Sequence, residues 1–216
     1  MNFLIQTINN KIIHDFSREL VEAIEYNNWF YNSNDYIYEL TETISLKPSK
    51  DICPCGSVEF VIGYMKLNYN IDLKPINIPE CLFKYAGRYV FNGTYNDINY
   101  CHFIKSNDII KGISGFVDSL SYEDIIKNKN YQISQRINIL SEYRCFVFKN
   151  ELVGIKHYTG DFELFPDIST IKSMIRDYKD CPIAYTLDVG IDEYKNTIII
   201  ECHDFFSCGL YLMIIN

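Results

Sequence analysis

Apolar positions follow strand-like and helical periods in turn along this chain, and the alternation predicts a mixed α+β protein. The apolar triplet at 3–5 predicts a short strand. An amphipathic helix is predicted next, because apolar residues recur at helical spacing in Phe16, Leu20, Ala23 and Ile24. Strand-like pieces follow at 36–38 and 52–55. The opening part of the chain therefore predicts a small α/β unit.

A glycine and a serine stand between the strand at 52–55 and a second predicted helix. The apolar stripe of that helix is Val58, Val61, Ile62 and Met65. Gly56 permits a tight turn, and Ser57 is placed to cap the helix. A helix N-terminus of this kind also binds anions, so capping alone and an anion site are both open.

The run at 100–105 predicts a strand that closes on a lysine and leads into a polar loop. Lys111 lies in that loop with two glycines, which let the backbone approach a ligand closely. Arg88, Lys105 and Lys111 would together neutralise a triphosphate. Loop lysines also simply solvate a surface, and that alternative stays open.

An arginine lies on a face of the strand predicted at 141–148. Alternation places Glu142 and Arg144 on the same face. A hairpin partner strand is predicted at 151–158, and the last helix begins at Asp167 or Ser169. Arg144 is therefore either half of a structural ion pair with Glu142 or a clamp for a ligand.

The runs 183–189 and 197–205 predict a C-terminal hairpin whose apolar residues give way to acids. The acids are Asp188, Glu201 and Asp204. Strict alternation places Ile199, Glu201 and His203 on one face and Ile198, Ile200 and Cys202 on the other. Carboxylates beside a core are costly unless a cation compensates, so the acids predict a hard-cation site, typically Mg²⁺ with a nucleotide phosphate. Solvated acids at strand ends are the alternative.

Composition narrows the class of protein. The 216 residues are 48% hydrophobic and 22% charged, as in an ordinary globular protein. The net charge of -8 argues against a nucleic-acid partner. No apolar run approaches the roughly 20 residues that span a bilayer, and the N-terminus lacks the features of a signal peptide. We therefore expect a cytoplasmic protein with no membrane partner.

The eight cysteines are expected to be reduced thiols. Cys53 and Cys55 form the only close pair, and no second pair stands at zinc-finger spacing. Cys101-His102 and Cys202-His203 offer a metal-binding alternative, but buried free thiols are favoured.

The order of these segments resembles the ATP-grasp superfamily, and most closely its clade named for two arginines and a lysine. The matching segments are 54–60, 103–105, 141–147, 185–189 and 201–211. The resemblance implies two α+β subdomains that clasp ATP, at about 85–136 and 137–216, preceded by a small α/β pre-ATP-grasp domain at 1–84. The boundary near residue 84 follows the extended, proline-containing stretch 74–79.

The same resemblance implies a role for each candidate site residue. Arg88 and Lys105 would reach the ATP phosphates, under the loop that contains Lys111. Residues Gln135, Arg136 and Ile137 would form the hinge that meets adenine, with Glu142 also at the nucleotide. Arg144 would face the transferred phosphate or the acyl phosphate. The metal, Mg²⁺, would be held by Asp188, Glu201, His203 and Asp204.

One position departs from the superfamily, which usually has Asn two residues after the metal-binding glutamate. Here that residue is His203, and an imidazole nitrogen is a poorer Mg²⁺ ligand than an amide oxygen. Either Asp204 takes over, or the metal is held differently, or the activity has drifted.

Two functional hypotheses follow from the resemblance. The first is an ATP- and Mg²⁺-dependent ligase that joins a carboxylate to an amine through an acyl phosphate, on a peptide, amino acid or other small molecule. The second is a protein of the same fold that binds a nucleotide or a partner without ligation. A structural protein without nucleotide is a third alternative.

Overall fold

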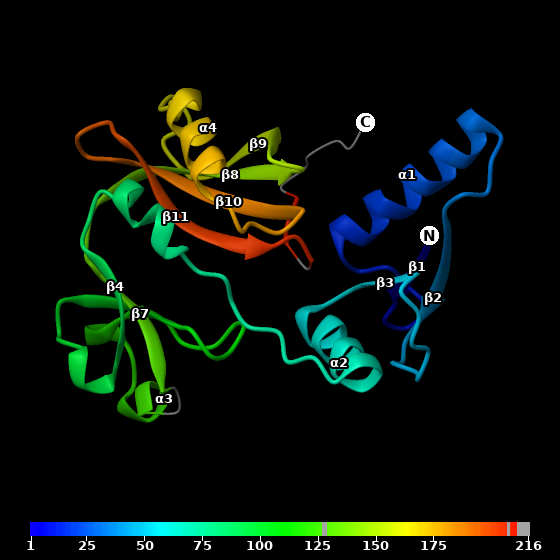
Figure 1. Ribbon diagram of the computed structural model, residues 1–216, viewed down its shortest axis with the longest axis horizontal. Coiled ribbons are helices and arrows are strands. Elements are labelled where there is room, and N and C mark those ends of the chain that lie inside the picture. The colour runs from blue at the N-terminus through cyan, green and yellow to red at the C-terminus, as the bar shows by residue number, and fades with distance from the viewer. Residues whose placement is uncertain (127–128, 207, 211–216) are drawn as a thin grey trace. The chain divides into compact units, whose positions relative to one another are not determined.

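The computed structural model describes residues 1–126, 129–206 and 208–210 and divides them into two compact units (Figure 1). The first is Met1–Leu73 together with the described residues from Phe206 onward, and the second is Lys74–Phe205. No helix among the described residues is both long enough and apolar enough to cross a membrane.

The first unit is a small parallel α/β layer. Its elements are β1 (Asn2–Gln6), α1 (Asp15–Tyr31), β2 (Ile37–Thr41), β3 (Ile52–Cys55) and α2 (Val58–Tyr69). The sheet order is β2-β1-β3, with both pairings parallel. Its buried cluster joins the sheet to α2 through Leu4, Phe60, Val61 and Tyr64. The predicted small α/β unit is therefore present.

Helix α2 begins as the sequence predicts and buries half of the predicted stripe. The Ser57 hydroxyl accepts the backbone N–H of Phe60 at 3.1 Å, so Ser57 is the N-cap. Val58 and Val61 of the predicted stripe are buried together with Phe60 and Tyr64, whereas Ile62 and Met65 are only half-buried. The predicted stripe is shifted because the larger aromatic rings bury more apolar area per residue.

The second unit contains two four-stranded antiparallel sheets. The smaller sheet has the order β4-β7-β5-β6, and the larger has the order β11-β10-β8-β9. The strands are β4 (Val90–Thr94), β5 (His102–Ser106), β6 (Ser114–Phe116), β7 (Asn130–Gln135), β8 (Ile139–Phe148), β9 (Glu151–Gly160), β10 (Ala184–Asp192) and β11 (Thr197–Asp204). The helical segments are η1 (Glu80–Tyr85), η2 (Tyr95–Asp97), η3 (Val117–Ser119), α3 (Tyr122–Ile126) and α4 (Ile168–Asp177). The chain crosses between the sheets from Gln135 to Ile139.

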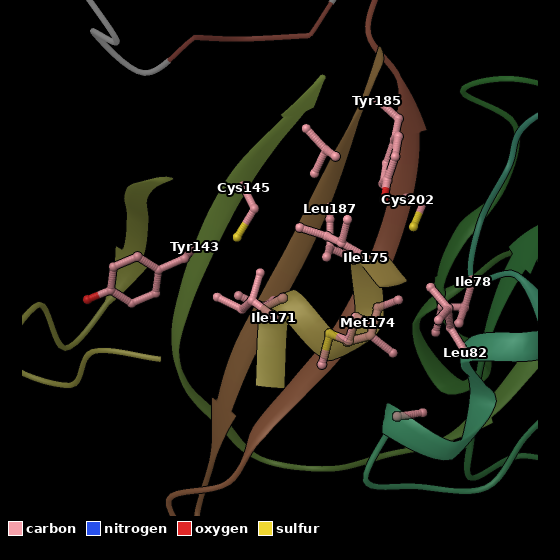
Figure 2. Close-up of a cluster of buried hydrophobic side chains, with 14 of the residues drawn as sticks. Ile78, Leu82, Tyr143, Cys145, Ile171, Met174, Ile175, Tyr185, Leu187 and Cys202 are labelled. Atoms are coloured by element: carbon pink, nitrogen blue, oxygen red, sulfur yellow. The ribbon is translucent and has the colours of Figure 1, made fainter. Parts of the chain in front are cut away.

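One face of the larger sheet packs against α4 (Figures 1 and 2). The helix starts at its N-cap Asp167, whose carboxylate accepts the N–H of Thr170 at 2.9 Å. Ile171, Met174 and Ile175 of α4 belong to the same buried cluster as Cys145 and Leu187 of the strands, among others. This face forms the main core, so the charged residues of the same strands lie on the opposite face.

The extended stretch 74–79 packs with the second unit. Ile78 is buried in its main core, and the carbonyl of Asn77 accepts the N–H of Cys202 at 2.8 Å. The Asn77 amide also donates to the carbonyl of Ser106 at 2.8 Å. The compact units therefore divide between Leu73 and Lys74, whereas the domain boundary predicted from sequence lies near residue 84.

All eight cysteines are free thiols. Cys145 and Cys202 are buried in the core of the larger sheet, where burial raises the pKa of each thiol. Within the described part of the chain, the side chains that gather closely enough to hold a metal ion are Asp188, Glu201 and His203, and none of them is a cysteine.

Candidate functional site

Four charged residues from neighbouring strands form a row across the larger sheet. Glu201 of β11 pairs in register with Asp188 of β10, Asp188 with Arg144 of β8, and Arg144 with Lys156 of β9. Alternation along β10 sends Leu187 and Val189 into the core and leaves Asp188 on the opposite face. The register of three strand pairs thus assembles this row from positions far apart in sequence.

A bulge alters which residues accompany Glu201. The pairing shifts after Asp188, so Val189 is opposite Ile199, and Ile200 is the extra residue of β11. Ile199 is buried in the main core with Cys202, whereas Ile200 lines a cavity with Glu201. The prediction that Ile199 shares a face with Glu201 was therefore wrong, because strict alternation cannot anticipate a bulge.

Arg144 and Asp188 form a buried, two-pronged ion pair. The guanidinium donates from Nε to Oδ1 at 2.8 Å and from Nη2 to Oδ2 at 2.7 Å. Arg144 is 8% exposed and Asp188 1% exposed. A buried charge of either kind is costly without its partner, so each side chain holds the other in place. The cross-strand partner of Arg144 is thus Asp188, where sequence analysis considered Glu142.

Lys105 reaches the row from the smaller sheet and forms an ion pair with Glu201. Burial lowers the pKa of the Lys105 ammonium to about 8, and the nearby Asp188 carboxylate partly offsets that effect. Lys105 is therefore mostly charged at neutral pH. This contact brings the two sheets together at the acidic end of the row.

His203 completes the cluster on the same face of β11. Its Nε2 forms a hydrogen bond with Oε1 of Glu201 and lies 3.9 Å from Oδ2 of Asp188. Burial, followed by the positive charge of Lys105, lowers the pKa of His203 to about 4. The imidazole is thus neutral at physiological pH, with a lone pair available on one ring nitrogen.

Three side chains of this cluster form a potential metal site. One ligand atom from each of Asp188, Glu201 and His203 lies within 4.8 Å of the others. The two carboxylates suit Mg²⁺, whereas the imidazole nitrogen does not. Asp204 is not in the group: it pairs with Tyr185 at the end of β11, and burial raises the pKa of its carboxyl group. The structure therefore brings together three of the four predicted metal ligands.

A cavity of about 410 Å³ lies between the two sheets of the second unit, beside this row. Its volume is within the range of small-molecule sites. Its lining includes six residues singled out from the sequence: Arg88, Lys105, Gln135, Ile137, Glu142 and Glu201. Apolar walls are supplied by both sheets, with Phe103 and Phe116 on one and Ile139 and Ile200 on the other.

Arg88 and Gln135 are both held in place by backbone contacts. Nη1 of Arg88 donates to the carbonyls of Ala86 and Ile199 at 3.0 Å each. Burial lowers the pKa of this guanidinium to about 10, which leaves it charged at neutral pH. The Gln135 side chain accepts the N–H of Tyr89 at 3.1 Å. These side chains are therefore pre-positioned at the cavity wall.

Of the residues predicted to bind the nucleotide, Lys111 and Arg136 do not line the cavity. Lys111 lies in the turn before β6 with a positive φ of 54°. Arg136 donates to Asp118 at 2.8 Å and lies 3.9 Å from the ring centre of Phe116. The hinge residues thus diverge, with Gln135 and Ile137 at the cavity and Arg136 at its outer edge.

Sequence reasoning missed several residues that shape the site. The Tyr158 hydroxyl donates to Glu142 at 2.6 Å, and burial raises the pKa of this phenol. The Gln132 side chain accepts the N–H of Ile78 at 3.0 Å and donates to its carbonyl at 2.8 Å. The available signal was the polar Gln132 between the apolar residues Tyr131 and Ile133. Nothing in the local pattern marks Tyr158.

Comparisons with known proteins agree with this arrangement. A family model of the ATP-grasp domain matches residues 85–214, and it describes family 2 of the clade named for two arginines and a lysine. No curated protein matches the chain.

Solved ATP-grasp structures match nearly the whole chain at low identity. A RimK-domain ATP-grasp protein from Sphaerobacter thermophilus is 13% identical, with 94% of this chain and 91% of that chain covered and a TM-score of 0.54. D-alanine–D-alanine ligase from Bacillus anthracis in complex with ATP is 12% identical, with 97% and 88% covered and a TM-score of 0.52. The ATP-grasp ligase PsnB in complex with a minimal precursor is 9% identical, with 96% and 90% covered and a TM-score of 0.51. At these identities the likeness shows the fold alone, which is ATP-grasp. The family match shows that the chain belongs to the ATP-grasp domain family, in family 2 of the clade named for two arginines and a lysine.

Proposed function

We propose that this protein binds ATP in the cavity between the two sheets of its second unit and uses it to join a carboxylate to an amine. The observation that carries the proposal is the meeting of Lys105, Glu201, Asp188 and Arg144 beside a cavity of about 410 Å³ in a chain of this family. Basic groups there suit a triphosphate, and acidic groups suit its cation.

The cavity offers an apolar place for the base and charged groups for the phosphates. Ile139 and Ile200 would flank adenine, and the backbone at Gln135 and Ile137 would meet its polar edge. Lys105 and Arg88 would reach the phosphates from the opposite wall. A largely apolar pocket with a few convergent polar groups is the usual form of a small-molecule site.

The proposed reaction has two steps. A substrate carboxylate oxygen attacks the γ-phosphorus of ATP, which forms an acyl phosphate and releases ADP. An amine nitrogen then attacks the acyl carbon, and inorganic phosphate leaves as the amide forms and a proton passes to solvent. Lys105 and Arg144 would stabilise negative charge on the transferred phosphoryl group, since such catalysis is mainly positioning and electrostatics.

In this structure the side chains of Lys105 and Arg144 are paired with the carboxylates of Glu201 and Asp188. Binding of the nucleotide with its metal ion would therefore exchange these partners. Phosphate oxygens would replace the carboxylates beside Lys105 and Arg144, and the divalent metal ion would bind the freed carboxylates. Asp188 and Glu201 are the residues that would hold that cation, Mg²⁺ being the ion predicted from the sequence. Its bound charge would offset that of the phosphates.

The substrate class we propose is an amino acid, a peptide or another small molecule that supplies a carboxylate or an amine. The fold likeness to a D-alanine–D-alanine ligase and to a ligase in complex with a minimal precursor supports this class. We also propose residues 1–84 as a pre-ATP-grasp domain, residues 85–136 and 137–216 as the two subdomains, and the cytoplasm, where ATP is abundant, as the compartment.

A nucleotide-binding protein without ligase activity is the second candidate. His203 favours it, because an imidazole stands at a position where Mg²⁺ would prefer oxygen. The pairing of both carboxylates with resident cations favours it too, since a metal must displace them.

Thermal unfolding with ligands tests nucleotide binding. ATP with Mg²⁺ should raise the melting temperature, because saturation at about 100 times Kd adds about 2.7 kcal/mol of stability. The double variant Asp188→Asn, Glu201→Gln should lose the part of the shift that depends on the metal. His102→Asn, outside the cluster, is the control. An undiminished shift in the double variant would remove these two residues from the proposed metal site.

Product analysis separates the two candidates. Release of ADP over many turnovers that requires both a carboxylate and an amine substrate identifies a ligase. ATP binding without substrate-dependent ADP release, across amino acids and short peptides, identifies the binding protein.

A further inference from the structure

The cluster of Asp188, Glu201 and His203 offers two oxygen donors and one nitrogen donor at close range. All three ligand atoms lie within 4.8 Å of one another. His203 Nε2 and Asp188 Oδ2 are 3.9 Å apart, about 0.9 Å more than the spacing of about 3.0 Å that adjacent ligands have around an octahedral ion with bonds of about 2.1 Å. A small inward shift of the side chains would therefore complete a three-ligand site.

The nitrogen that faces the carboxylates is a ring nitrogen of His203. Its Nε2 is the atom in contact with Glu201 and the atom nearest to Asp188. Mg²⁺ prefers oxygen ligands and gives up its water reluctantly. Divalent transition ions accept imidazole readily and bind mixed nitrogen and oxygen sites more tightly. The donor set therefore matches a transition ion better than Mg²⁺.

A buried hydroxyl beside the cluster independently suggests that something binds there. Thr186 is fully buried, and its Oγ1 has no hydrogen-bond partner among the described residues. It lies two residues before Asp188, on the same face of β10, and directly opposite His203 in the strand register. Buried hydroxyl groups normally have a partner, and a water on a bound ion would supply one here.

Charge balance makes the nitrogen ligand decisive. Asp188 and Glu201 carry two negative charges, and their partners Arg144 and Lys105 carry two positive charges. Simple attraction for a dication is therefore largely cancelled in the resting site. An ion that also gains a bond to nitrogen competes better with the resident cations than one held by oxygen alone.

We propose that the Asp188–Glu201–His203 cluster selects a divalent transition ion, such as Mn²⁺, over Mg²⁺, with His203 as the selecting ligand. This inference rests on the proposed function, because it names the metal of the same nucleotide site. Asp188 and Glu201 would bind either ion, and His203 would decide which ion is held more tightly.

Electron paramagnetic resonance on the full chain tests the proposal, with Mn²⁺ itself as the probe. Free Mn²⁺ is titrated with protein, with and without a non-hydrolysable ATP analogue, and Mg²⁺ is then added as competitor. The wild-type protein should bind Mn²⁺ at least about tenfold more tightly than Mg²⁺, and pulsed measurements should show magnetic coupling of the bound ion to a ¹⁴N nucleus. The ¹⁴N coupling is measured on the wild-type protein, so this part of the test does not depend on the folding of a variant.

The matched variants are His203→Asn, which offers an amide oxygen, and His102→Asn, which removes an imidazole outside the cluster. His203→Asn should abolish the ¹⁴N coupling and reduce the ratio of Mn²⁺ to Mg²⁺ affinity by about tenfold or more, as loss of a metal-site partner usually does. His102→Asn should leave both unchanged. Circular dichroism checks that each variant is folded.

The outcomes separate this inference from the proposed function. If both ions bind equally well and no ¹⁴N coupling appears, His203 is not a ligand and the inference fails, while ATP-dependent ligation still stands on ADP release. If neither ion binds with or without nucleotide, the inference fails together with the metal site. If Mn²⁺ is selected through nitrogen but no substrate promotes ADP release, the inference holds and the ligase fails.

Discussion

Replacing Arg144 with Met should leave the buried carboxylate of Asp188 without its charged partner. Asp188 is 1% exposed, and both its oxygens accept hydrogen bonds from Arg144 at 2.7–2.8 Å. Removal of one partner of such a pair costs about 3–5 kcal/mol. We expect the lower end, about 3 kcal/mol, because Lys105 and His203 remain close to Asp188.

A double-mutant cycle distinguishes the cost of leaving one buried charge unpaired from the cost of lost side-chain packing. Asp188→Leu should cost about as much as Arg144→Met, because it leaves Arg144 buried without its partner. The double variant Arg144→Met, Asp188→Leu should lie within about 1 kcal/mol of wild type, since well-packed apolar replacements of buried ion pairs are often neutral. The coupling energy should therefore be several kcal/mol, and its sign identifies the ion pair.

Urea unfolding followed by far-ultraviolet circular dichroism measures these free energies. Arg136→Met is the control, because Arg136 also holds a carboxylate, that of Asp118, but its side chain is 49% exposed. That variant should lose no more than about 1 kcal/mol. If Arg144→Met is as mild as Arg136→Met, the pair at Asp188 is not desolvated and the reasoning about the row is refuted.

Three further predictions concern single groups. ATP affinity should fall as the pH rises through about 8, by up to about tenfold per pH unit, because Lys105 with its lowered pKa loses its charge in that range. Calorimetry at several pH values measures the affinity, and Lys105→Arg should show a flatter pH profile. Ser57→Ala should lower the free energy of unfolding by about 1 kcal/mol because the cap of α2 is lost, whereas Ser57→Asp should retain it in the same urea assay. Leu187→Ala should cost about 2–5 kcal/mol in the fully buried core, while Val153→Ala, which is 54% exposed, should stay within about 0.5 kcal/mol.

Much of the fold follows from local pattern. The caps at Ser57 and Asp167 were readable because a capping side chain contacts backbone only two or three residues away. The faces of β8 were readable as well, since Cys145 is in the core and Arg144 is on the opposite side.

The gathering of the site was predicted through the order of segments, whereas its pairings were not. Asp188 meets Arg144 and Lys105 meets Glu201 across many residues of chain, and no local period encodes which cation pairs with which acid. The placement of Asn77 is of the same kind. The extended stretch 74–79 is fixed by hydrogen bonds between Asn77 and the residues Ser106 and Cys202, which lie on different sheets.

The bulge after Asp188 shows how one extra residue builds the site. Without it, Ile200 would face the core and Ile199 would accompany Glu201. With it, Ile199 fills the core and Ile200 joins Ile139 at the cavity wall.

Gly190 makes that arrangement sterically possible. A Cβ at this position would lie 2.8 Å from Cγ2 of Ile139 and 3.1 Å from Cδ1 of Ile200, so any larger residue would push both isoleucines away from the strand. Those two side chains form one apolar wall of the cavity, and Glu201 follows Ile200 directly. The bulge and the glycine therefore act together: they place the apolar cavity wall formed by Ile139 and Ile200 next to the carboxylate of Glu201.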